Sequence, residues 1–187
     1  PRPSNPNEER LLALAGATIP LASSSAKARA AFEAELVQNV RSLLDGPGRN
    51  IDLDAPIGSL GTTTLIAASI AGNLPLVAEL IARGADPMAH ELHPMDVTAL
   101  FKAAVYGRAD IVALLLDHIA ESGQQQLEAA INETGRANGF TPLHDAELWG
   151  HQAIADLLIA RGARADIEDF AGRTAAQLIA ARRATKA

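Results

Sequence analysis

The histidines of segment 90–96 are the residues whose types and spacing come closest to a chemical site. His90 and His93 are three positions apart, and Asp96 follows three positions later. Two imidazoles and a carboxylate in one loop could contact a single metal ion. Zinc, however, needs three or four ligands held by further hydrogen bonds, which a loop with two histidines does not supply. We interpret the segment as a polar loop and expect no metal site.

No other pattern in the sequence indicates a catalytic site. The chain contains no cysteine, which excludes thiolate catalysis and cysteine-bound zinc. It has no Gly-x-Ser-x-Gly elbow and no Walker-type phosphate loop, and no pair of carboxylates is placed to serve as acid and base. The acidic residues Glu121, Glu128 and Glu168 are typical of a solvated surface. We therefore expect a protein that is not an enzyme and needs no cofactor.

Composition and charge narrow the class of fold and of partner. Hydrophobic residues make up 48% of the 187 residues, charged residues 20% and aromatic residues only 3%. These proportions favour a globular core of closely packed helices over a β-sandwich or barrel. The net charge of −6 disfavours nucleic acid and anionic membranes as partners, since both are bound through basic surfaces. No apolar run approaches the roughly 18 residues that would span a membrane.

The segment Leu11–Ala22 is apolar and ends in small residues, like the core of a signal peptide. Glu8 and Glu9 precede it, where a signal peptide carries positive charge, so a short amphipathic helix is the better interpretation. A chain without cysteine fits a reducing or an oxidising compartment. We expect a cytoplasmic protein, with the periplasm and secretion as alternatives.

Repeated helix pairs are the elements that would position any functional residue. In three segments a threonine is followed nine positions later by a glycine: Thr63 and Gly72, Thr98 and Gly107, Thr141 and Gly150. Thr174 begins a similar fourth segment, and the four threonines are 35, 43 and 33 residues apart. The hydroxyl of such a threonine can cap a helix, and the glycine allows the chain to reverse into a second helix. One helix pair cannot bury its apolar side alone, which explains why the unit is repeated.

This pattern resembles the ankyrin repeat, whose period is about 33 residues. The third unit carries Thr141-Pro142-Leu143-His144 and then Gly150-His151, which is close to the ankyrin signature, and the resemblance extends over residues 61–183. It implies an all-α solenoid of stacked helix–turn–helix units with short hairpin loops, capped at both ends. It also implies that His144 and His151 are structural residues that join neighbouring loops by hydrogen bonds. The function that it implies is non-catalytic protein–protein interaction.

The repeat units are unequal, but we expect one continuous structural domain. It divides into an N-terminal helical cap with a degenerate repeat (1–60), three ankyrin repeats (61–95, 96–138 and 139–171) and a C-terminal half-repeat cap (172–187). Outside the three repeats the sequence predicts helices at Asn7–Ala17, Ala26–Leu44 and Thr174–Lys186. Ser23–Ser25 offers an N-cap for the second of these helices.

An insertion lengthens the second repeat. Ser122-Gly123 breaks the preceding helix, and Gln124–Ile131 predicts a short extra helix with Leu127 and Ile131 on one face. Insertions in repeat proteins often belong to a binding surface. Neutral drift in a surface loop is the alternative, because a longer loop costs little free energy.

The resemblance also implies where a partner would dock. In ankyrin repeats the variable contact positions lie around the Gly-x-Thr element and just before the turn glycine, on the concave face. Carried over position by position, they give these candidate partner-binding residues: Leu60, Met95, Val97, Tyr106, Phe140, Trp149, Phe170 and Arg173. Four of the six aromatic residues of the chain fall on these positions, and aromatic and arginine side chains are frequent hot spots of interfaces.

Tyr106 and Trp149 occupy the same place in adjacent repeats, so we expect them to lie side by side. The alternative is that the rings serve packing. Phe140 stands where ankyrin sequences often carry a packing aromatic, and Tyr106 and Trp149 would then cover the groove between helices. Phe101 replaces the signature histidine of its repeat, and we expect it in the core.

These features favour a module that is monomeric when free and docks a protein partner of unknown identity on the concave face. One alternative is an inhibitor, an immunity protein or an accessory subunit of a bacterial enzyme. Another is a secreted effector that binds a host protein. The Ala- and Arg-rich, Lys-poor composition is typical of a GC-rich bacterial genome, which is why bacterial roles are considered.

Overall fold

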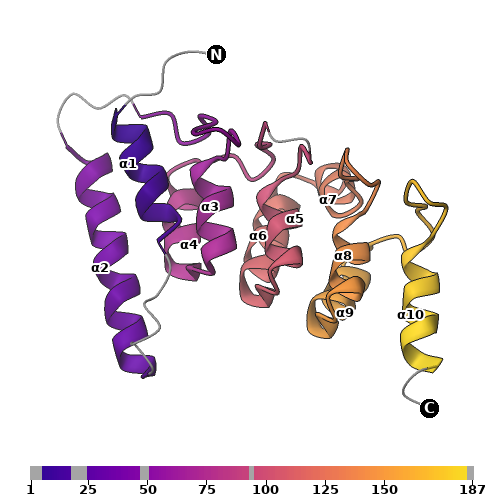
Figure 1. The fold of residues 1–187 in the computed structure, drawn as a ribbon. Helices are drawn as coiled ribbons and strands as arrows, with labels where there is room; N and C mark the ends of the chain where they lie inside the picture. Colours follow the sequence, from indigo (N-terminus) through magenta and orange to yellow (C-terminus); the bar gives the residue numbers. More distant parts are fainter. Residues whose placement is uncertain (1–5, 18–24, 47–50, 93–94, 185–187) are drawn as a thin grey trace.

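The computed structural model describes residues 6–17, 25–46, 51–92 and 95–184, which form helices joined by short loops (Figure 1). β-pairing in these ranges is limited to two isolated bridges, Ile57 with Thr62 and Glu168 with Thr174. The all-α expectation is therefore confirmed. The helices are α1 (Pro6–Ala15), α2 (Ala26–Leu44), α3 (Thr64–Ala71), α4 (Leu74–Ala82), α5 (Ala99–Val105), α6 (Ala109–Glu121), α7 (Gln124–Ile131), α8 (Pro142–Leu148), α9 (Gln152–Ala160) and α10 (Ala175–Ala184).

Two layers of helices run along the molecule (Figure 1). In the inner layer α1, α3, α5, α8 and α10 follow one another, and each helix packs against the next. In the outer layer α2, α4, α6 and α9 do the same. Helices α1 and α2 thus stack like one more repeat pair before the first threonine. The boundaries of the units that the sequence suggests stay a prediction.

The predicted threonine caps form in two of the three repeats. Thr63 and Thr141 each accept a hydrogen bond from the amide three positions later, at 3.3 and 3.4 Å. Thr98 precedes α5 in the same way, but its hydroxyl makes no capping bond. It donates instead to Glu133 Oε2 at 2.8 Å. The expectation for Thr98 is corrected because Glu133, just beyond the inserted helix, supplies a charged acceptor that attracts the hydroxyl.

Turn glycines separate the inner helices from the outer ones. Their φ angles are 78° at Gly72, 71° at Gly107 and 74° at Gly150, a left-handed conformation that side chains with a Cβ rarely adopt. The residue after the second and third glycines links its repeat to the one before. The Arg108 guanidinium donates to the Ile70 carbonyl at 3.1 and 3.2 Å, and His151 Nε2 lies 3.0 Å from the Val105 carbonyl oxygen.

The first helices and the last lie close to their predicted positions. Helix α2 has the predicted bounds, and Ser25 Oγ caps it by accepting a hydrogen bond from the Ala28 amide at 3.1 Å. Ser23 lies outside the described residues. Helix α1 begins and ends slightly earlier than predicted, at Pro6 and Ala15. Helix α10 begins at Ala175, one residue later than predicted, and is described as far as Ala184. The last two residues of the predicted helix lie outside the described ranges.

Ion pairs join the outer helices α2 and α4. Glu79 of α4 accepts hydrogen bonds from Arg41 of α2 and from Arg83, both at 2.7 Å. Arg83 also donates to Asp45, at 2.6 Å. Hydrogen bonds from the two guanidinium groups lower the pKa of Glu79 to about 2, so the carboxylate stays charged. The N-terminal helix pair is thereby attached to the first recognisable repeat.

The inserted helix α7 has the predicted bounds, Gln124–Ile131. Gly123 precedes it with a φ of 119°, which ends α6 and redirects the chain. Helix α7 packs against α6 and α5 and buries Leu127, Ala130 and Ile131. The insertion therefore adds to the hydrophobic core next to α5.

Candidate protein-binding face

Tyr106 and Trp149 follow the last residues of two neighbouring inner helices, α5 and α8. Each ring stands eight residues after the cap threonine of its repeat, and each is well exposed, 49% for Tyr106 and 62% for Trp149. Together with Val105 the two rings line a hollow of about 290 Å³, named here the Tyr–Trp hollow. Both rings line the same hollow. Tyr106 and Trp149 therefore lie side by side, as predicted.

A buried carboxyl group lies one helical turn before Trp149. Asp145 of α8 is only 6% exposed, and burial raises its pKa to about 6. A hydrogen bond from the Trp149 side chain and the positive charge of Lys102 on α5 both act in the opposite direction. Sequence reasoning missed this residue, since aspartate is rarely buried without an ionic partner.

Lys102 of α5 and Glu147 of α8, two other charged residues of the inner helices, are engaged in ion pairs. Lys102 Nζ lies 2.8 Å from Oε1 of the buried Glu91, and Arg182 Nε of α10 lies 2.8 Å from Oε2 of Glu147 on α8. In the loop before α10, Arg173 pairs with Asp169 at 2.8 Å. The side chains that line the Tyr–Trp hollow are uncharged, and one of them, Trp149, forms a hydrogen bond with the carboxyl group of Asp145.

Two of the candidate contact residues are not on the surface. Val97 is fully buried and Phe140 is 9% exposed, and both pack with Phe101 in a small cluster under the loops. Phe140 stacks on the His144 ring with 5.6 Å between the ring centres, and the Arg173 guanidinium covers it at 5.6 Å. The expectation that Val97 and Phe140 contact a partner is therefore corrected. Both side chains fill the space beneath the loops, and the packing alternative holds for Phe140.

The histidines of the third unit join structural elements. His144 Nδ1 accepts a hydrogen bond from the Thr141 amide at 3.1 Å, and His144 Nε2 lies 3.2 Å from the Arg173 carbonyl oxygen in the next unit. Burial lowers the pKa of His144. His151 bonds back to the preceding unit, as described above. Both histidines thus have the linking role that the resemblance implies.

The comparison with known families agrees with this geometry. The family described as ankyrin repeats (three copies) matches residues 28–126 and 65–171, which together span most of the chain. The chain belongs to the ankyrin-repeat family. Ankyrin-repeat domains are in general non-catalytic modules for protein interaction, so the chain carries an interaction fold.

One curated relative of this ankyrin-repeat chain is the phosphocholine transferase AnkX of Legionella pneumophila subsp. pneumophila. The two proteins are 29% identical over 122 residues, which is 65% of this chain and 12% of AnkX. The chain therefore matches only a small part of that relative's length. This bacterial relative suggests, without showing, a bacterial origin for the chain.

Exposed apolar side chains also lie on the loops of the ankyrin stack. Leu60 is 51% exposed and Phe170 is 73% exposed, as expected for contact positions, while Met95 is half-buried against the cluster of Phe101. Leu92 is 69% exposed, and sequence reasoning missed it because it stands at none of the family's variable positions. Leu92 lies directly over Gly61, as Phe170 lies over Gly139. The loop tips therefore present an apolar edge.

Contacts of the His90 side chain hold the polar loop between the first and second ankyrin units. His90 Nδ1 lies 3.3 Å from Asp96 Oδ1, and His90 Nε2 lies 3.2 Å from Glu133 Oε1. His93 lies outside the described residues. Within the described ranges, no three side chains of the metal-binding types are placed to hold an ion.

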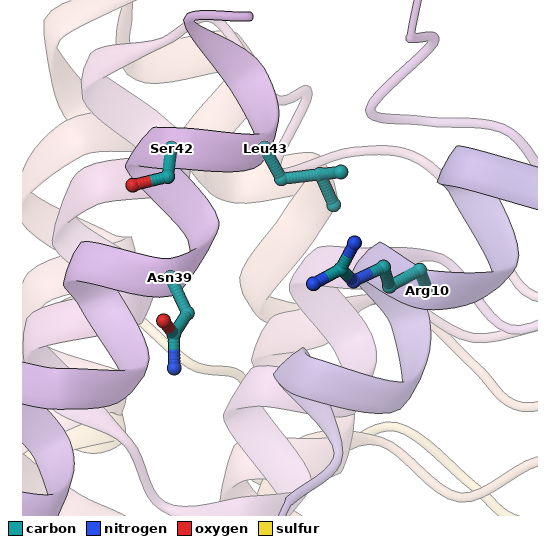
Figure 2. Close-up of a pocket in the computed structure, with 4 residues that line it drawn as sticks. All are labelled: Arg10, Asn39, Ser42 and Leu43. Carbon is teal, nitrogen blue, oxygen red and sulfur yellow. The ribbon is translucent and has the colours of Figure 1, made fainter.

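A second hollow lies between α1 and α2 of the ankyrin stack (Figure 2). It has a volume of about 220 Å³ and is lined by Arg10, Asn39, Ser42 and Leu43. Arg10 reaches from α1 toward α2, and the three polar residues are exposed to solvent.

None of the described helices combines the length and the apolar character that crossing a membrane requires.

Proposed function

We propose that this ankyrin-repeat protein binds a protein partner on the face formed by its inner helices and loop tips, with Tyr106 and Trp149 at the centre. The distribution of exposed apolar side chains carries the proposal. Seven large hydrophobic side chains are exposed in the described part of the chain. Six lie at the ends of inner helices or on the loops: Leu60, Leu92, Tyr106, Leu148, Trp149 and Phe170. Only Ile159 lies on an outer helix, α9.

Such clustering supports binding because water-exposed apolar surface is costly and, when gathered on one side, marks an interaction site. The proposed contact residues are therefore Leu60, Met95, Tyr106, Trp149, Phe170 and Arg173, with Leu92 and Leu148 added. Val97 and Phe140 support them from beneath. A stable complex of this kind buries roughly 1,200–2,000 Å² in total. The proposed partner is a protein and not a nucleic acid, since the chain carries a net charge of −6.

A second candidate function is the docking of an enzyme or of its target. The match to part of a phosphocholine transferase favours it, since that protein carries a similar stretch within a much longer chain. In this role the ankyrin stack binds and positions, and the chemistry belongs to another domain or subunit. The matched 12% of the transferase is too small a share to extend phosphocholine transfer to this chain.

Site-specific photo-crosslinking in the native cell tests the proposed face. A benzophenone amino acid at position 149 is expected to capture one protein of defined mass. The same amino acid at position 159, an exposed apolar position on the outer helix α9, is the matched control and should not capture it. Capture at 159 with none at 149 would place the interface on the outer helices and refute the proposal.

A further inference from the structure

Asp145 has an acceptor atom without a donor. The residue is 6% exposed, and no described residue donates a hydrogen bond to its Oδ2. Most buried polar atoms in folded proteins have a partner, and an ionised oxygen without one destabilises the fold. An exception of this kind calls for an explanation, and a donor from outside the chain would supply one.

The neighbours of Asp145 are engaged elsewhere. Lys102 occupies the equivalent position on α5, but its ammonium group binds Glu91 at 2.8 Å. On the other side Arg182 binds Glu147 at 2.8 Å. The carboxyl of Asp145 therefore lacks an ion pair among the described residues. A cation that satisfied Oδ2 would have to come from outside the described residues.

The surroundings of Asp145 indicate which cation fits. Trp149 follows one turn later on the same side of α8 and bounds the Tyr–Trp hollow together with Tyr106 and Val105. Aromatic faces attract cations, and the planar guanidinium group stacks on them more readily than the strongly hydrated ammonium group does. A guanidinium also keeps donors in its plane that remain free while it stacks.

We propose that the Tyr–Trp hollow and Asp145 form one subsite for an arginine side chain of the partner, stacked on Tyr106 and Trp149 and donating to Asp145 Oδ2. The inference deepens the proposed function and rests on it. Entry requires Trp149 to move aside, because Oδ2 is closed off from solvent. Trp149 is 62% exposed and lies at the end of its helix, so the movement costs little packing and gives up mainly its hydrogen bond to Asp145.

Nuclear magnetic resonance can test the subsite, because Trp149 is the only tryptophan of the chain and gives a single indole N–H signal. The probe is the capped tripeptide Ac-Ala-Arg-Ala-NH₂, added to the full chain. A saturable shift of the indole signal is expected. Its size at a fixed peptide concentration should fall at least threefold in the shape-conserving variant Asp145→Asn, whose fold is verified by the rest of the spectrum.

Two further peptides give the chemical specificity. The citrulline peptide keeps the shape of arginine without its charge, and the lysine peptide keeps the charge without the plane. Both are expected to shift the signal at least threefold less than the arginine peptide. Equal shifts with all three peptides, or an undiminished shift in Asp145→Asn, would overturn the arginine assignment. No shift with any peptide, alongside partner capture at position 149, would overturn the subsite and leave the proposed function standing.

Discussion

Replacing both Tyr106 and Trp149 with alanine is expected to weaken binding of the captured partner at least about 100-fold. Central aromatic hot spots each contribute roughly 2 kcal/mol or more to a protein interface, and a loss of about 2.7 kcal/mol is already 100-fold in Kd. The two rings are 49% and 62% exposed in the free protein, so their removal should leave the fold intact. Calorimetric titration of the purified partner measures the affinity.

The control for this experiment is Ile159→Ala. Ile159 is 44% exposed, so the control also removes an exposed apolar side chain, but from the outer helix α9. It should change the affinity by less than about threefold. A double variant that stays folded by circular dichroism and binds with unchanged affinity would refute the assignment of the site.

Asp145→Asn is expected to stabilise the free protein at pH 8 by about 1–3 kcal/mol. Burial raises the pKa of Asp145 from 3.8 to about 6, so the folded state holds the proton more tightly than the unfolded chain does. The resulting penalty is absent below about pH 4, grows between pH 4 and 6 and is complete above pH 6. A shift of about two units corresponds to roughly 3 kcal/mol, which sets the upper end of the range.

Urea denaturation at pH 8 and pH 4 measures this effect. The stabilisation by Asp145→Asn should be present at pH 8 and nearly absent at pH 4. The matched control is Glu147→Gln on the same helix, which removes the buried negative charge that pairs with Arg182 and should destabilise the protein at pH 8. Other groups near Asp145 that carry charge or titrate are His144, Lys102 and Glu91, and both variants retain them. Equal destabilisation by Asp145→Asn at both pH values would show that the carboxyl serves the fold and not a ligand.

Much of the fold could be predicted because single residues determine where its helices begin and where the chain turns between them. The threonine and glycine spacing located the starts and turns of the inner helices, and Ser122-Gly123 located the inserted helix α7. Thr98 was the exception among the caps. Its competing partner, Glu133, is 35 residues away in sequence, and hydrogen bonds over such separations leave no local pattern.

The candidate site could be predicted only in outline. Tyr106 and Trp149 were found because repeat positions predict neighbours in space. The burial of single side chains was harder to predict. Val97 and Phe140 occupy variable positions of the family and yet lie under the loops. Leu92 and Asp145 were missed for a related reason. The exposure of Leu92 and the burial of Asp145 depend on how adjacent repeats pack, and residue type alone does not reveal that packing.

Hydrogen–deuterium exchange of the free chain and of its partner complex tests the central claim most directly, because it reports on both layers of helices at once. The predicted result is slower exchange in the segments around Tyr106 and Trp149 and in the loop tips at Leu60, Leu92 and Phe170. Exchange in the outer helices α4, α6 and α9 should stay unchanged. Protection confined to those outer helices, with the segments of Tyr106 and Trp149 exchanging as in the free chain, would contradict the account.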